Sequence, residues 1–229
     1  MKSIKFYGFP ILISFILLGA SCSSIETNKI APGFKVAFDS IKKAVFGYPE
    51  NTFITREIVE NIPYASLTLK IGKGPRGLLI LESVNDNETL WVSRDNVYIR
   101  LENGRITRTL GLVNNIVTYL SPKVLFQDLL KERPVNIDFF AYYSYEKPVL
   151  NNLRTKVKIR EISEQTIVIL GHEKNTIVFE EEVENSYLGW KVKNKYWVDP
   201  KNGFVWKSIQ NPSPKLPQFT IEVTKKPAI

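Results

Sequence analysis

From Tyr64 to the C-terminus, apolar and polar residues alternate in short runs. In the segment 63–72, PYASLTLKIG, the apolar positions are Ala65, Leu67, Leu69 and Ile71. Successive side chains of a strand point to opposite faces, so this alternation indicates half-buried β-strands. Similar runs, separated by Gly, Asn and Asp, occupy 76–84, 89–93, 97–102, 105–110, 135–145, 154–162, 166–171, 175–183, 195–199, 203–209 and 218–223. About a dozen such strands predict an antiparallel all-β fold, either a barrel or a sandwich.

Three segments depart from the alternation of period two. Phe34, Phe38, Ile41 and Val45 have helical spacing, which predicts an N-terminal amphipathic helix. This helix is expected to pack against the sheet, with a membrane surface as the alternative. The segment 54–63 predicts one or two further helical turns, and the segment 114–133 is less regular, with helical character.

Asn103-Gly104 joins two strand-like runs, and this dipeptide is the strongest short-range signal of a β-hairpin. If the two residues form the loop, the expected pairs are Glu102–Arg105, Leu101–Ile106, Ile99–Arg108 and Val97–Leu110. This register places Arg108 on the apolar face of the hairpin.

A charged arginine cannot remain unpaired in a dry core, because its desolvation costs several kcal/mol. Arg108 is therefore expected either to pair with a buried carboxylate as a structural residue or to line a wet lumen that holds a ligand. The structural role is favoured, because side chains usually fill a small barrel. Arg105, beside the turn and opposite Glu102, is expected to be more exposed and to be the better candidate for a ligand contact.

The N-terminal segment has the order of a secretory signal: Lys2 and Lys5, an apolar stretch, then small residues up to Cys22. Leu18-Gly19-Ala20-Ser21-Cys22 resembles a bacterial lipobox, with leucine one place earlier than usual, so Cys22 is the predicted site of acylation. Ser23 rather than Asp favours the outer membrane. The expected organisation is a signal peptide over 1–21, a tether over 22–33 and a single β-rich domain over 34–229.

The formal net charge is +8 at pH 7, and Cys22 is the single cysteine. A secretory signal and scattered lysines argue against nucleic acid as a partner and favour membrane phosphates or an anionic polysaccharide. A mildly basic solvated surface explains the same charge. Without an intramolecular disulfide, a hydrophobic core must stabilise the fold.

Enzymatic chemistry has little support in the sequence. The single histidine, His172, lies where a turn is expected, and no G-x-S-x-G motif accompanies it. Zinc usually takes several His or Cys ligands, which this chain lacks, and GKGP at 72–75 lacks the ending of a phosphate loop. A carboxylate pair for glycoside hydrolysis stays open. The sequence predicts no enzyme activity, no metal and no cofactor.

Aromatic residues are the other candidates for binding, because flat rings can stack on sugar faces. The candidate platform comprises Trp91, Tyr143, Trp197 and Trp206. A place in the core is the alternative for each ring. In FFAYYSY, 139–145, both sets of alternate positions hold aromatic rings, so one face should be partly exposed or line a cavity.

Three segments, PYASLTLKIGKGPRGLLIL, LWVSRDNVYIRLENGRITRTLGL and YWVDPKNGFVWKSIQNPSPKLPQFTIEV, resemble the YjbF/GfcB family of bacterial lipoproteins. The resemblance implies a β-barrel-like antiparallel fold and a link to capsule and exopolysaccharide operons, and it carries no established catalytic residue. Its motifs include Tyr64 and Ser66, and Arg105 and Arg108, which become candidate ligand or structural residues. Asn96 stands where a glycine is common, and asparagine tolerates positive φ.

The favoured function is that of an outer-membrane lipoprotein, facing the periplasm, accessory to the assembly or export of capsule or exopolysaccharide. It would bind a glycan or the export and assembly proteins without catalysis, and its lipid partner would be reached through acylated Cys22. The alternative is a periplasmic carrier that holds lipid or lipoprotein in a concave β half-barrel. A polysaccharide-processing enzyme is a third hypothesis.

Overall fold

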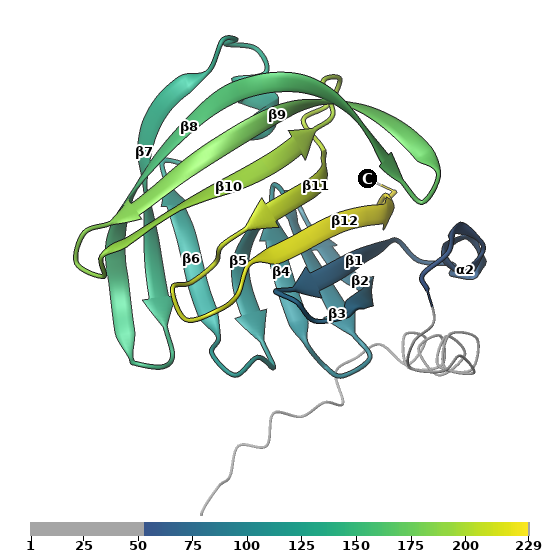
Figure 1. The fold of residues 1–229 in the computed structure, drawn as a ribbon, viewed down its shortest axis with the longest axis horizontal. Helices are drawn as coiled ribbons and strands as arrows, with labels where there is room; N and C mark the ends of the chain where they lie inside the picture. The colour runs from purple at the N-terminus through teal and green to yellow at the C-terminus, as the bar shows by residue number, and fades with distance from the viewer. Residues whose placement is uncertain (1–52, 229) are drawn as a thin grey trace, which may run out of the picture. The chain divides into compact units, whose positions relative to one another are not determined.

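The computed structural model describes residues 53–228, in which the strands form one closed antiparallel barrel (Figure 1). Each strand pairs with its neighbours in sequence, and β1 closes the ring against β12. The strands are β1 (Ser66–Ile71), β2 (Arg76–Asn85), β3 (Glu88–Ser93), β4 (Tyr98–Glu102), β5 (Arg105–Leu110), β6 (Ile116–Ser121), β7 (Asn136–Tyr145), β8 (Leu150–Ile169), β9 (His172–Asn185), β10 (Trp190–Val198), β11 (Val205–Gln210) and β12 (Phe219–Lys225). The all-β prediction is confirmed, with a barrel rather than a sandwich.

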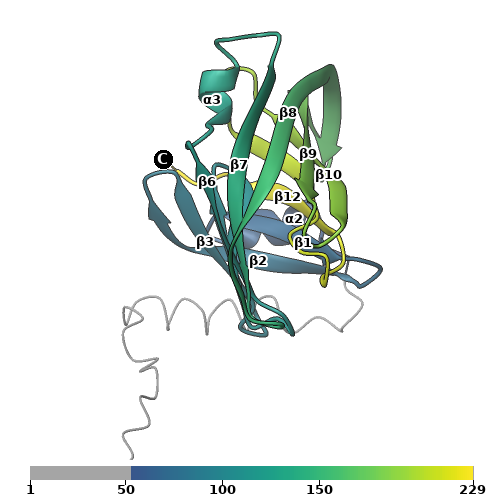
Figure 2. The same ribbon diagram turned by 90° about the vertical axis from the view of Figure 1, so that its left-hand side faces the viewer.

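Within residues 53–228, two short helices accompany the barrel. Helix α2 (Arg56–Asn61) confirms the predicted helical turns, and the Thr55 hydroxyl caps it by accepting a hydrogen bond from the Ile58 amide. Helix α3 (Phe126–Leu129) lies in the connection between β6 and β7 (Figure 2). Helical character was wrong for 116–121, which form β6. The predicted helix at 34–45 lies outside the described residues. Among those described, no helix is long and apolar enough to cross a membrane.

The barrel interior follows from the period-two pattern. In β7, Phe139, Ala141, Tyr143 and Tyr145 point inward and are buried, while the alternate positions are partly exposed, which confirms the expectation for the two aromatic faces of FFAYYSY. The largest fully buried side chains are Trp91, Tyr196, Phe126, Phe179, Phe219, Leu67, Leu79, Ile99, Ile116 and Ile159. Phe126 belongs to this core, so α3 packs into the barrel.

The β8–β9 hairpin is long, and Figure 1 shows it arching beyond the neighbouring strands toward α2. A second apolar cluster of Ile167, Ile169, Val178 and Trp197 forms at this extension. Arg56 of α2 donates hydrogen bonds to the carbonyl oxygens of Ile169, Leu170 and Thr224. The arginine therefore fastens the tip of the hairpin to β12.

The Asn103-Gly104 hairpin forms as predicted, but its register changes after the second pair from the turn. Glu102 pairs with Arg105 and Leu101 with Ile106, whereas Arg100 pairs with Arg108. Thr107 is thus an extra residue in β5, a β-bulge that shifts every later side chain by one position. The prediction that Arg108 lies on the apolar face is wrong, because the bulge turns Arg108 to the exposed outer face.

Candidate functional site

Arg105, rather than Arg108, is the arginine of β5 that points into the barrel. Its side chain is 5% exposed, and its Nε donates a hydrogen bond to Glu181 Oε1 at 2.7 Å. Its Nη1 donates to the Val124 carbonyl oxygen at 2.8 Å, and the guanidinium lies 4.1 Å from the centre of the Phe126 ring. The expectation that Arg105 is exposed is wrong, because its side chain turns into the barrel, where Glu181 offers a buried counter-charge and the Phe126 ring of α3 packs against it.

Two buried tyrosine hydroxyls lie in the surroundings of this interior ion pair. Burial first, and then the negative charge of Glu181, raise the pKa of the Tyr143 and Tyr196 hydroxyls. Gln210 of β11 holds the backbone on both sides of Arg105, because its amide nitrogen donates to the Gly104 carbonyl oxygen and its amide oxygen accepts from the Ile106 amide. Gln210 and the Arg105–Glu181 pair thus hold the start of β5 in place.

The space beside the interior ion pair measures about 20 Å³, which has room for about one water molecule. An acyl chain needs far more volume. The barrel is also closed rather than concave and open. The half-barrel expected for a lipid or lipoprotein carrier therefore differs from the fold of residues 53–228.

A larger pocket, the mouth pocket, opens at one end of the barrel and measures about 350 Å³. In a barrel whose strands run up and down in sequence order, every second turn lies at the same end. The mouth pocket accordingly combines the β2–β3 turn, the β4–β5 turn, the start of α3, the β10–β11 turn and the residues after β12. Its volume lies at the lower end of the range for small-molecule sites.

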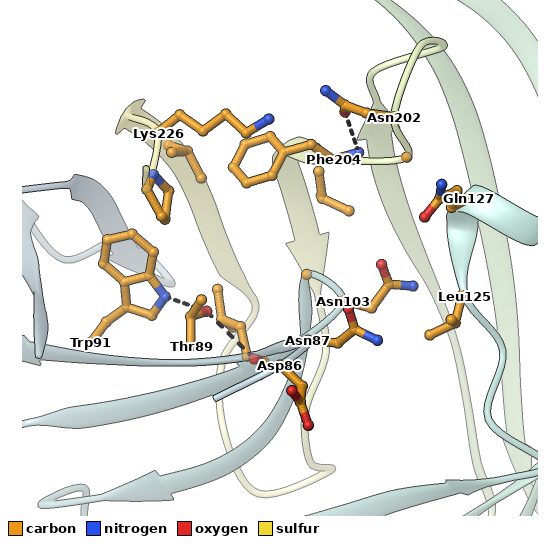
Figure 3. Close-up of a pocket in the computed structure, with 16 residues that line it drawn as sticks. Asp86, Asn87, Thr89, Trp91, Asn103, Leu125, Gln127, Asn202, Phe204 and Lys226 are labelled. Atoms are coloured by element: carbon orange, nitrogen blue, oxygen red, sulfur yellow. Dashed lines mark hydrogen bonds between the residues drawn. The ribbon is translucent and has the colours of Figure 1, made fainter. Parts of the chain in front are cut away.

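Figure 3 shows amide side chains and an aromatic ring around the mouth pocket. The Phe204 ring and Lys226 lie on one side, with the Lys226 nitrogen 4.7 Å from the ring centre. The amides belong to Asn87, Asn103, Gln127 and Asn202. The apolar wall includes Trp91, whose indole nitrogen donates to the Thr89 hydroxyl at 2.8 Å.

Two glycines allow the walls of the mouth pocket to approach closely. Gly203 has φ +73°, and a Cβ atom there would lie 2.6 Å from the Gln127 backbone nitrogen. Gly104 has φ +76°, and its Cβ would lie 2.4 Å from a methyl group of Val205. The β4–β5 turn, the β10–β11 turn and α3 therefore form a tightly packed frame.

The chemistry of the mouth pocket suits a polyhydroxyl ligand. Amide groups both donate and accept hydrogen bonds, as sugar hydroxyls do, and Lys226 adds a positive charge. An aromatic ring next to such groups offers an apolar surface for the C–H face of a sugar.

Within residues 53–228, no group of three or more His, Cys, Asp or Glu side chains could hold a metal ion. His172 lies exposed at the β8–β9 turn, as predicted.

The other polar candidates lie in separate places. Ser66 is fully buried, and its hydroxyl shares a hydrogen bond of 2.9 Å with the Thr224 hydroxyl, so its role is structural. Tyr64 precedes β1 and is partly exposed. Asn96 has φ +58°, as expected for a residue at the position of a glycine. Cys22 lies outside the described residues.

The four aromatic candidates do not form one platform. Trp91 and Tyr143 belong to the barrel core, although Trp91 also lines the mouth pocket. Trp197 is buried in the second apolar cluster, and the partly buried Trp206 packs against it. Alternation in each strand identified the aromatic faces, but it could not show that the β8–β9 hairpin covers Trp197.

Sequence reasoning missed Asn87, Gln127, Asn202, Phe204 and Lys226 as members of one site. The turns that carry most of them were recognisable from Asp-Asn and Asn-Gly pairs. Short intervals between successive strands are typical of an up-and-down barrel, in which every second turn lies at the same end. This pattern could therefore have placed these turns together.

The described chain is a closed antiparallel barrel with a buried Arg–Glu pair and a polar pocket at one mouth. The chain belongs to the family described as "Group 4 capsule polysaccharide lipoprotein gfcB, YjbF", whose model matches residues 38–224. This confirms the family resemblance noted from the sequence motifs.

Two lipoproteins of Escherichia coli (strain K12) are similar along most of their length. The chain is 24% identical over 209 residues to "Uncharacterized lipoprotein GfcB", covering 88% of this chain and 91% of that protein. It is 24% identical over 196 residues to "Uncharacterized lipoprotein YjbF", covering 83% and 85% of the two chains. The crystal structure of the hypothetical lipoprotein YmcC from E. coli (K12) matches with a TM-score of 0.69 at 21% identity, covering 83% of this chain and 96% of that one. The last comparison shows a shared fold.

Proposed function

We propose that the protein is a lipoprotein accessory to the assembly or export of capsule or exopolysaccharide, and that the mouth pocket binds glycan without transforming it. The observation that carries the proposal is the combination of amides, Phe204 and Lys226 around a space of about 350 Å³. Membership in a family described by group 4 capsule polysaccharide supports the choice of ligand. The names of the relatives include no catalytic activity.

Acylation of Cys22 would anchor the protein to the outer membrane, with the barrel in the periplasm. The leader over 1–21 and the tether over 22–33 belong to the same proposal. Export and assembly proteins of the polysaccharide are the partners it implies. The names of the relatives as lipoproteins support a lipid anchor.

A binding measurement tests the function of the mouth pocket. Purified mature protein would be titrated with oligosaccharides released from the polysaccharide of the source strain. The double variant Gln127→Ala/Lys226→Ala is expected to weaken binding by about tenfold or more, because it removes two hydrogen-bonding groups, one of them charged. Lys201→Ala, in the β10–β11 turn but not lining the pocket, is the matched control.

A genetic experiment tests the pathway. Deleting the gene should reduce the yield or chain length of the surface polysaccharide, and wild-type protein should restore it. The double pocket variant should fail to restore it, although it reaches the membrane at normal abundance. Unchanged polysaccharide in the deletion strain would refute the proposed function.

A further inference from the structure

A groove of about 270 Å³ lies on the outer face of the barrel, across β2 to β5. This outer groove is lined by Glu82, Leu90, Tyr98, Arg100, Arg108 and Leu110, with Thr109 beside them. It is separate from the mouth pocket, since the two share no lining residue. The register places Leu90 opposite Arg100 and Arg100 opposite Arg108 in one row.

The positions of Arg100 and Arg108 on neighbouring strands are unfavourable for the stability of the sheet. Like charges directly opposite one another on neighbouring strands destabilise a sheet. Arg100 has a counter-charge, because its Nη1 lies 3.3 Å from Glu88 Oε2. Arg108 makes no hydrogen bond or ion pair with another described residue. Its guanidinium is therefore free to bind an anionic ligand in the outer groove.

Two β-bulges shape the outer groove. Thr107 is the extra residue of β5 that turns Arg108 outward, and Glu82 is the extra residue of β2 between the pairs Leu81–Trp91 and Ser83–Leu90. Bulges often re-aim a side chain beside a functional site. Here they direct a carboxylate and a guanidinium toward the same groove.

The Glu82 carboxylate, which lines the outer groove, restricts the kind of ligand that fits there. One of its carboxylate oxygens is buried and has no hydrogen-bond partner among the described residues. Burial raises the pKa of Glu82, and burial together with the Glu82 charge raises the pKa of Tyr98. A carboxylate beside two arginines suits a ligand that has both an anionic group and hydroxyl donors. It disfavours a compact phosphate dianion, because that ligand brings two negative charges near Glu82 and offers it at most one hydroxyl donor.

We propose that the outer groove binds an acidic sugar unit, with Arg100 and Arg108 holding its carboxylate and Glu82 accepting its hydroxyls. Guanidinium forks match carboxylates, and the resulting charge-assisted hydrogen bonds are stronger than neutral ones. Tyr98, Leu90 and Leu110 offer apolar contact to the sugar ring. The ligand class rests on the proposed function, since it specifies an acidic glycan, but the site is distinct from the mouth pocket.

Titration of the purified mature protein with trigalacturonic acid tests the proposal. Wild-type protein should bind it and should bind its neutral methyl ester more weakly. Arg108→Gln should weaken binding of the acid by about tenfold, the effect of losing hydrogen bonds to a charged group. Lys158→Gln, which removes one positive charge from the exposed outer face of β8, should leave binding unchanged.

Stability and competing ligands complete the test. Arg108→Gln should melt at the same temperature as wild type or higher, because it removes a like-charge pair. Equal binding by wild type and Arg108→Gln would overturn the proposal. So would stronger binding of inorganic phosphate, or of phosphatidylglycerol vesicles, than of trigalacturonic acid. Gln127→Ala/Lys226→Ala should retain binding of the acid, which separates failure of this site from failure of the mouth pocket.

Discussion

Arg105 brings a positive charge into the barrel interior, where Glu181 compensates it at 2.7 Å. Both side chains are about as buried as the apolar residues around them. Such a pair contributes little net stability relative to apolar side chains, but losing one partner strands the other charge. The two arginines of β5 therefore differ in kind, since Arg108 is exposed and makes no ion pair with another described residue.

Arg105→Met is expected to lower the free energy of unfolding by about 3–5 kcal/mol, because Glu181 would remain buried without its counter-charge. Urea denaturation followed by tryptophan fluorescence measures the change. Arg108→Met is the matched control and should be nearly neutral. The double variant Arg105→Met/Glu181→Leu should recover much of the loss. A neutral single variant would contradict the structural role of the pair.

Among the elements, the strands were the most predictable part. Alternation and turn residues located nearly all of them, because each strand has one face toward the core. The register of β4 and β5 was not predictable, since Thr107 is extra only in relation to its partner strand. Strand β6 was missed because its residue types do not alternate although its burial does: Val117 and Tyr119 lie on the exposed face, and Thr118 is buried.

The mouth pocket depends on the arrangement of elements rather than on a motif. Gln127 and Lys226 are far apart in sequence and line one pocket only because the barrel closes between β1 and β12. Of the aromatic candidates from the sequence, Trp91 lines the pocket. Trp197 does not, because the β8–β9 hairpin buries it. A sequence can indicate turns and rings, but closure determines which of them meet.

The attachment of the β8–β9 hairpin gives a prediction at this scale. Arg56→Ala should remove three hydrogen bonds that fasten the hairpin tip to α2 and β12. We expect a loss of about 1.5–3 kcal/mol, typical of hydrogen bonds to a charged group, and faster amide exchange over 163–178. Hydrogen–deuterium exchange measures the local effect. Glu60→Ala, on the exposed side of α2, should change neither quantity; equal exchange in both variants would contradict the fastening role.

At the scale of the whole molecule, the closed barrel of the described residues separates a packed interior from two polar surfaces, the mouth pocket and the outer groove. The interior holds several tyrosine hydroxyls together with the Arg105–Glu181 pair. Burial raises the pKa of Tyr143, Tyr145 and Tyr196 above the ordinary value of 10.0. The folded barrel therefore keeps these hydroxyls protonated at a pH at which the unfolded chain loses its protons.

This difference predicts alkaline destabilisation. The stabilisation is fully present below pH 10 and is lost as pH rises above it, because the unfolded state then binds fewer protons than the folded state. Each fully buried tyrosine should lower the free energy of unfolding by up to about 1.4 kcal/mol per pH unit in that range. Urea denaturation between pH 8 and about pH 11.5 measures the slope. Tyr143→Phe should make the slope shallower above pH 10, since one titrating group is gone, while lysine titration is common to both proteins. Parallel curves for the variant and the wild type would show that Tyr143 ionises as readily in the barrel as in the unfolded chain.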